Sequence, residues 1–325
     1  SPKLFKLMDD TTNIEMFKIS PVIKVDFNGK EIKLVKLGDV AKVKQGLSPV
    51  PYSRYVRQLP DTRGNYKEID LSLVLKESEL EEIRKDEILR LDVIEINLFK
   101  IFNAMTHQHR YFGGRYFVPY DKGGESDIEG NWLPNYRVAT YYFIDWSENA
   151  IKKMKTDEHV YLRNTKYYFK QGITFSHTGQ YSPTFRIGAG CPFDVAGSSL
   201  FLNQGQEVKT FIGIISSKIC KYDLKTFINH SVNMSEDPIK QIPLILKLRD
   251  EKTKLIANQV NKIIHNQKQN PRYDYMTNEQ IEIDKLVYQM YNLNEKDIKE
   301  VEDWYFRRYP KLAKVIEEKI KNKSL

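Results

Sequence analysis

The sequence has few of the residues that build metal centres or covalent cross-links. Only two of its 325 residues are cysteine, Cys191 and Cys220, and two thiols complete neither a four-thiolate zinc site nor a disulfide framework. His107 and His109 would share one face of a strand, but no cysteine or carboxylate nearby completes a ligand set. We therefore expect no metal site, and we expect a reducing cytoplasm as the compartment.

Long apolar runs and recognisable catalytic loops are also missing. No stretch approaches the roughly 20 apolar residues of a membrane-spanning helix, and no signal peptide is present. The glycines of 121–124 and 188–190 lack the Gly-Lys-Ser/Thr of a P-loop, so turns are the favoured interpretation. Ser176 precedes His177 without the Gly-x-Ser-x-Gly elbow of a hydrolase. We predict a cytoplasmic chain without membrane contact and without catalytic residues.

Basic residues outnumber acidic ones. The chain has 51 Lys and Arg against 43 Asp and Glu, a formal net charge of +8. Such an excess suits a polyanionic partner, but it does not by itself identify one.

The first 90 residues contain a clear hairpin and an acidic segment. Alternating apolar residues over 22–36 flank Asn28-Gly29, a pair that favours a tight turn. Residues 37–46 alternate Lys42 and Lys44 with apolar neighbours before a glycine, which favours a short helix or strand. A capping box and helical spacing predict an acidic helix near 78–90.

The rest of the chain changes from a strand-like to a helical pattern. From about 92 to 202, aromatic and β-branched runs are separated by glycines, with one short helix expected after Ser147. The period then changes from two to 3.6, which predicts a closing helix near 207–227 and further helices near 244–267, 278–291 and 295–307. We predict an α+β fold with a β-rich domain over 1–240 and a helical domain over 241–325.

Cations and aromatic rings alternate through the middle of the strand-rich part, between 107 and 186. Cations neutralise phosphates, an arginine fork binds guanine, and planar rings stack on bases. A tyrosine-rich sheet with a solvated cationic face explains the same pattern without a ligand. As DNA-binding residues we predict Arg110, Arg115, Lys122, Arg137, Lys166, Lys170, Ser176, His177 and Arg186.

Three of these residues have a more specific predicted role. A single ammonium beside two glycines suits a phosphate, so we assign Lys122 to the DNA backbone. The guanidinium fork of Arg115 or Arg137 matches guanine, so we expect one of them to contact a base.

Five stretches resemble, in the family's order, the C-terminal region of large single-chain DNA adenine-N6 methyltransferases. That family includes type IIG restriction enzymes and the PglX-like methyltransferases of BREX phage defence. The stretches are Leu37-Gly-Asp-Val-Ala-Lys-Val-Lys-Gln-Gly46, Val118-Pro-Tyr-Asp-Lys-Gly-Gly124, Gly172-Ile-Thr-Phe-Ser-His177, Pro192-Phe-Asp-Val-Ala-Gly-Ser-Ser199 and the segment from Gly213 to Pro243.

The resemblance implies a division of labour. Residues up to about 240 would form a DNA target recognition domain, and the later helices would act as a spacer or dock on an upstream methyltransferase module of the same parent chain. The family's Asn-Pro-Pro-Tyr motif and its glycine-rich turn for S-adenosylmethionine are absent here. We therefore expect no cofactor in this chain, S-adenosylmethionine in the parent enzyme, double-stranded DNA as partner, and Ser1 as the start of a fragment.

Two other classes of function remain open from the sequence. The basic face could bind an acidic protein within a phage-defence complex. A nuclease is a third class, because Asp26, Glu31 and Lys33 superficially resemble a restriction-nuclease motif; the match is short enough to arise by chance.

Overall fold

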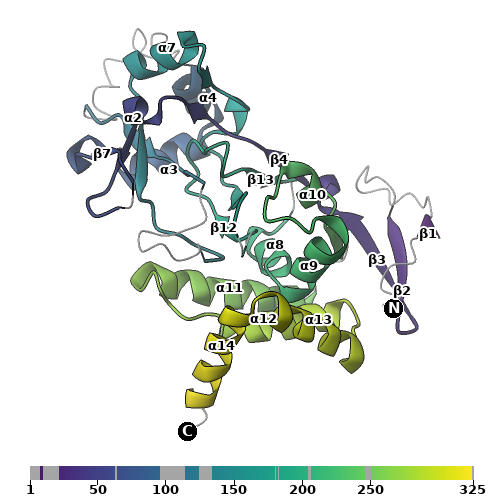
Figure 1. Cartoon of the computed structure of the whole chain (residues 1–325). Helices are drawn as coiled ribbons and strands as arrows, with labels where there is room; N and C mark the ends of the chain where they lie inside the picture. Colours follow the sequence, from purple (N-terminus) through teal and green to yellow (C-terminus); the bar gives the residue numbers. More distant parts are fainter. Residues whose placement is uncertain are drawn as a thin grey trace.

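The chain folds into several small β-sheets followed by a helical C-terminal part (Figure 1). A computed structural model describes residues 8–9, 22–62, 64–95, 114–123, 134–179, 181, 183–203, 206–245 and 250–323. The sheets lie between residues 8 and 245, and four helices occupy 251–323. The predicted α+β class is confirmed. None of the helices in these ranges has the length and apolar character needed to cross a membrane.

The predicted hairpin forms the first sheet. Asn28 and Gly29 both adopt positive φ, at 53° and 79°, which is the conformation that lets two strands meet through a two-residue turn. The sheet has the order β1-β2-β3-β14. Its strands are β1 (Met8–Asp9), β2 (Ile23–Phe27), β3 (Lys30–Lys36) and β14 (Pro243–Ile245).

A second four-stranded sheet follows a short helix, α1 (Leu37–Val40), that leads directly into β4. All its neighbouring strands run antiparallel, in the order β12-β11-β13-β4. The strands are β4 (Ala41–Lys44), β11 (Ile173–Phe175), β12 (Phe185–Ile187) and β13 (Ser199–Leu202).

The third sheet, a two-stranded ribbon and several short helices form the part drawn at the upper left of Figure 1. The sheet order is β7-β6-β9-β8, and the ribbon pairs β10 with β5. The strands are β5 (Ser48–Pro49), β6 (Val56–Gln58), β7 (Lys67–Glu68), β8 (Phe117–Pro119), β9 (Tyr142–Asp145) and β10 (Val160–Tyr161). The helices are α2 (Tyr52–Tyr55), α3 (Glu77–Lys85), α4 (Glu87–Glu95), α7 (Glu148–Thr156) and the 3₁₀ turns Leu71–Leu73 and Thr165–Tyr167.

Side-chain caps explain where several helices begin. Ser147 accepts a hydrogen bond from the Ala150 amide at 3.2 Å, so the helix expected after Ser147 is confirmed as α7. The acidic segment predicted as one helix near 78–90 is instead two. Asp86 divides it, because its carboxylate accepts from the amides of Ile88 and Leu89 at 2.8 and 3.0 Å and starts α4.

The single helix predicted near 207–227 is also divided. Helix α8 (Val208–Ile215) ends before Ser217, which caps α9 (Lys218–Asp223) by accepting a hydrogen bond from the Cys220 amide. A π-helical turn, Leu224–Ile228, and helix α10 (Glu236–Lys240) follow. Hydroxyl side chains compete with the backbone for such bonds, so a Ser-Ser pair ends a helix that its apolar neighbours would continue. The later helices are α11 (Glu251–Gln269), α12 (Glu279–Met290), α13 (Glu295–Arg308) and the unpredicted α14 (Pro310–Lys323).

Two large hydrophobic cores hold these elements together. The first includes residues from Val22 to Val301 and joins the first two sheets to α8, α9, α11, α12 and α13. The second lies between Leu47 and Phe201 and sits within the third sheet and its helices. A domain border at residue 240 stays a prediction.

Gly213 in α8 marks a close contact between the β-rich part and the C-terminal helices. A Cβ at this position would lie 2.4 Å from Ile256 Cγ2 and 3.2 Å from Val260 Cγ2, both on α11. Helix α11 therefore needs a glycine here in order to approach α8.

We expect Gly213→Ala to lower the free energy of unfolding. Alanine favours the helix by about 1 kcal/mol, but overpacking costs about 1–3 kcal/mol, and β-branched neighbours cannot easily move aside. A Cβ only 2.4 Å from Ile256 Cγ2 puts the overpacking cost in the upper half of that range, so the expected net loss is about 1–2 kcal/mol by urea unfolding. Asn258→Ala, on the exposed side of α11, is the control and should change stability by less than about 0.5 kcal/mol. Equal stability of the two variants would contradict the proposed close contact.

Candidate nucleic-acid interface

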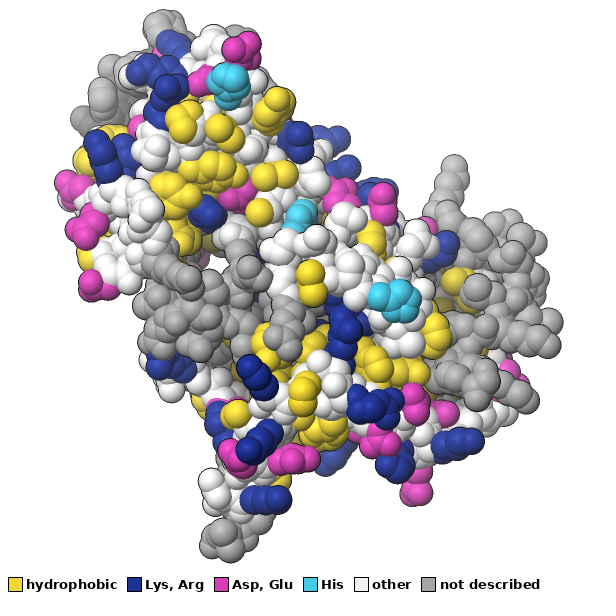
Figure 2. Space-filling view, in the orientation of Figure 1, with side chains coloured by type: hydrophobic (Ala, Val, Ile, Leu, Met, Phe, Trp, Pro, Cys, Tyr) yellow, Lys and Arg dark blue, Asp and Glu magenta, His cyan; other side chains and the backbone are white. Residues whose placement is uncertain are grey.

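The predicted DNA-binding residues do not share one surface. Arg110 lies outside the described residues. The others occur on different elements, and several point into the protein. On the face drawn in Figure 2, Lys and Arg side chains are likewise scattered among apolar and acidic ones. Each residue therefore has to be assessed from its own contacts.

Arg115 holds the start of helix α3. Its Nε donates to Glu79 Oε2 at 3.0 Å and its Nη2 donates to Glu79 Oε1. The Lys76 amide donates to the same carboxylate at 2.7 Å. Burial alone would raise the pKa of Glu79, but the Arg115 and Lys76 hydrogen bonds outweigh it and lower the pKa. In this structure the guanidinium fork is used on a carboxylate, so contact with guanine would require breaking that pair.

Lys122 faces a cage of three tyrosine rings. Its Nζ lies 5.5 Å from the ring centre of Tyr52, 5.8 Å from that of Tyr66 and 5.5 Å from that of Tyr142. Such distances allow cation–π attraction. Beside the cage, the buried Asp194 accepts a hydrogen bond from the Tyr52 hydroxyl at 3.0 Å. Burial raises the pKa of Asp194, and the charge of Lys122 opposes that rise.

Arg186 and Ser176 are buried. Their exposed fractions are 3% and 2%, and Arg186 Nη1 donates to Ser176 Oγ at 3.3 Å. The prediction that Arg186 binds DNA requires an exposed side chain, and the structure contradicts that requirement. Strand β12 is covered on its outer edge, because Tyr136 pairs with Arg186 through an isolated bridge. Burial lowers the pKa of Arg186, and the charge of Asp121 opposes this.

His177 and Arg137 support neighbouring segments. The half-buried His177 ring lies 5.2 Å from the Phe175 ring, and the His177 carbonyl accepts from the Met234 amide at 2.5 Å. Burial lowers the pKa of His177. Arg137 Nη1 donates to the Gln267 carbonyl at 3.3 Å, near the C-terminal end of α11, where a cation is favourable.

Lys166 and Lys170 are brought together around one ring, that of Tyr167. Their Nζ atoms lie 5.6 and 5.8 Å from the ring centre, and Lys44 contributes a third ammonium at 5.8 Å. Lys166 and Lys170 are exposed and Lys44 is half-buried. We call these four residues the Tyr167 cluster.

The Tyr167 cluster is held by buried neighbours. The Tyr167 ring packs on Phe201 of β13 at 4.6 Å, and Lys44 pairs in register with Ser199 of the same strand. The buried Arg90 donates a hydrogen bond to the Lys166 carbonyl at 2.9 Å and so holds the backbone of the cluster. The sequence does not place Lys44 here, because only strand pairing brings it next to a segment about 120 residues later. The alternation around Lys42 and Lys44 was the one signal that this side of the strand faces solvent.

The cluster concentrates positive charge. Partial burial lowers the pKa of Lys170, as do the charges of Arg90 and Lys166, while Glu87 acts in the opposite direction. Within the described ranges, none of the three lysines of the cluster makes an ion pair with a carboxylate. Among the described residues, the cluster therefore carries positive charge that no ion pair neutralises.

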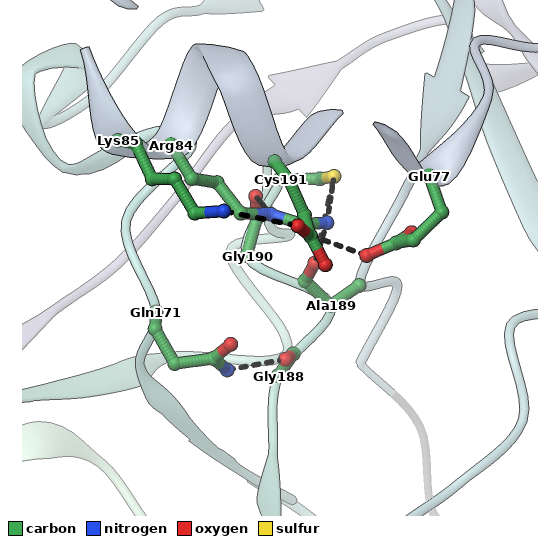
Figure 3. A network of polar contacts seen from close by, with 9 residues as sticks. Glu77, Arg84, Lys85, Gln171, Gly188, Ala189, Gly190 and Cys191 are labelled. Carbon is green, nitrogen blue, oxygen red and sulfur yellow. Dashed lines mark hydrogen bonds and ion pairs between the residues drawn. The ribbon is translucent and has the colours of Figure 1, made fainter. Parts of the chain in front are cut away.

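The glycine-rich loop at 188–190 is a structural turn. Arg84 of α3 donates to the carbonyls of Gly190 and Ala189 at 3.0 and 2.6 Å, contacts Cys191 Sγ at 3.6 Å and pairs with Glu77 (Figure 3). Gln171 donates to the Gly188 carbonyl at 2.6 Å. These contacts satisfy carbonyl oxygens, which do not bind phosphate.

The comparisons with known proteins do not assign a family. Neither a scan of protein-family models nor a search of curated proteins gave a match to this chain. Across the described residues, no group of three or more His, Cys, Asp or Glu side chains is placed to hold a metal ion. The resemblance to adenine methyltransferases stays a hypothesis that rests on the sequence motifs.

We expect Lys122→Met to destabilise the fold. Methionine keeps most of the volume but removes the cation from the tyrosine cage and leaves Asp194 without its nearby positive charge. Cation–π contacts contribute about 0.5–2 kcal/mol each, so the expected loss of unfolding free energy is about 1–3 kcal/mol. Tyr66→Phe keeps the ring and should have little effect, whereas Tyr66→Leu should cause part of the loss. A Lys122→Met chain with unchanged stability and weaker DNA binding would support a phosphate contact instead.

Proposed function

We propose that this chain binds double-stranded DNA as the target recognition part of a site-specific adenine-N6 methyltransferase. The observation that supports DNA binding is the Tyr167 cluster, with three ammonium groups around one ring and no carboxylate partner among the described residues. The assignment to a methyltransferase of restriction-modification or BREX phage defence rests on the five motif stretches.

Electrostatics favours a phosphate ligand at this cluster. Like charges that are held together by the fold repel one another, and bringing an anion between them removes that repulsion. Duplex DNA carries one negative charge per roughly 1.7 Å of its axis, so a compact group of lysines can contact successive phosphates. Several surface lysines on the helices are instead paired with a carboxylate one turn away, as Lys152 is with Glu148.

The proposed division of labour fits the chemistry. A methyltransferase must flip its target base out of the duplex, and specificity then has to come from groups that contact neighbouring bases. This chain would supply those contacts and the backbone contacts that position them. An upstream module of the parent would bind S-adenosylmethionine and transfer the methyl group.

The alternative is a protein-interaction module that uses the same cations for an acidic protein. Both partners would be attracted electrostatically, but only a nucleic acid releases condensed counterions in proportion to the phosphates contacted. The dependence of affinity on salt therefore separates the two functions.

We expect combined replacement of Lys44, Lys166 and Lys170 by alanine to weaken duplex binding for all sequences. Three lost phosphate contacts should reduce the slope of log affinity against log salt by about two to three units, since each contributes about 0.9. The measurement is fluorescence anisotropy with a labelled duplex at several salt concentrations. The charge-matched control replaces Lys254, Lys262 and Lys268, which are exposed on α11, and should leave the slope nearly unchanged.

Two results would contradict the proposal in different ways. If the unmodified chain binds no duplex but binds an acidic protein, the interaction-module function replaces DNA binding. If it binds DNA and both triple variants behave alike, the phosphate contacts lie away from the Tyr167 cluster.

A further inference from the structure

An exposed arginine, Arg163, is close in the chain to the Tyr167 cluster and has no acidic partner among the described residues. It follows the β10 strand and precedes the turn that carries Lys166. Its guanidinium carbon lies 5.3 Å from the ring centre of Tyr161, and its Nη1 donates to Gln45 Oε1 at 2.9 Å. Gln45 directly follows Lys44 of the cluster, and Lys166 of the cluster comes three residues after Arg163, so Arg163 is tied to segments that carry two of the three lysines.

The backbone around Arg163 is fixed. The Arg163 carbonyl accepts from the hydroxyl of the fully buried Tyr168 at 2.9 Å. The next residue, Asn164, adopts positive φ at 53° and donates from its side chain to the Gln45 carbonyl at 2.9 Å. On the other side, Val160 and Tyr161 pair with Pro49 and Ser48. The backbone of this segment therefore loses little further freedom on binding.

The side chain is constrained as well, and within the described part of the chain its remaining donors have no acceptor. Stacking on Tyr161 and the bond to Gln45 hold the guanidinium plane, while no described residue accepts from Nε or Nη2. Other arginines differ in this respect. Arg54 stacks on Tyr55 at 5.9 Å in the same way, but it is paired with Asp157 at 2.8 Å, and Arg115 is committed to Glu79.

We propose that Arg163 reads a guanine base and so determines part of the sequence specificity; this inference rests on the proposed DNA binding. Guanine presents two acceptors, N7 and O6, on its major-groove edge, and they match two donors of a guanidinium fork. The lysines of the Tyr167 cluster would bind phosphates and set the position of the duplex. Arg163, held by Tyr161 and Gln45, would then contact a base edge next to them.

The test is a selection from a pool of randomised duplexes with the unmodified chain, Arg163→Ala, Arg163→Lys and the matched control Arg54→Ala. For the unmodified chain and the control, we expect a guanine preference of roughly 5- to 150-fold at one position. Arg163→Ala should lose that preference while the other positions are retained. Arg163→Lys should lose most of it as well, because an ammonium keeps the charge but not the fork. The salt slope on the selected duplex should stay within about half a unit.

The outcomes separate this inference from the proposed function. If Arg163→Ala selects the same sequence, or if it weakens all duplexes equally and lowers the salt slope by about one unit, Arg163 does not read a base and DNA binding stands. Duplex binding by the unmodified chain without any sequence preference overturns the Arg163 assignment and the target-recognition role, and leaves only non-specific DNA binding standing. If the unmodified chain binds no duplex, both proposals fail.

Discussion

The antiparallel pairing of β13 with β4 is the contact on which the rest of the structure depends. Leu200 of β13 lies in the first core, and the next residue, Phe201, lies in the second. Successive residues of a strand point to opposite faces, so this one strand belongs to both cores. The same pairing brings Lys44 beside the ring that packs on Phe201. A one-residue shift in register would exchange the two faces and separate the cores.

The sequence predicts local structure well because local chemistry decides it. The turn at Asn28-Gly29 and the cap at Ser147 need only their own neighbours, and both form as expected. Contacts between distant segments are not encoded in this way. Arg186 follows the buried Phe185 along its strand, as an exposed residue would, yet its side chain is also buried and donates to Ser176, and nothing near Arg186 in the sequence indicates this. Lys44 became part of the candidate site for the same reason, through pairing with β13.

The overall positive charge is a poor guide to the surface of this chain. Arg84, Arg115 and Lys122 are each committed to carbonyls, a carboxylate or tyrosine rings within the fold. The net charge of the sequence includes these cations together with the exposed ones. Cations that bind internal partners fix loops and helix ends, whereas only cations without such partners can respond to a phosphate. Only the structure separates the two kinds of cation, because the residue types are the same.

In the segment between β10 and the buried Tyr168, the backbone is held in place while several side chains face solvent. Its backbone is held by Tyr168, Asn164 and the pairing of β10 with β5, while the side chains of Tyr161, Arg163 and Lys166 are exposed. Exposed side chains away from such supports usually alter stability by less than about 0.5 kcal/mol when replaced. Under the proposed function, related proteins could diverge in the DNA sequence they recognise by exchanging these side chains while the fold persists.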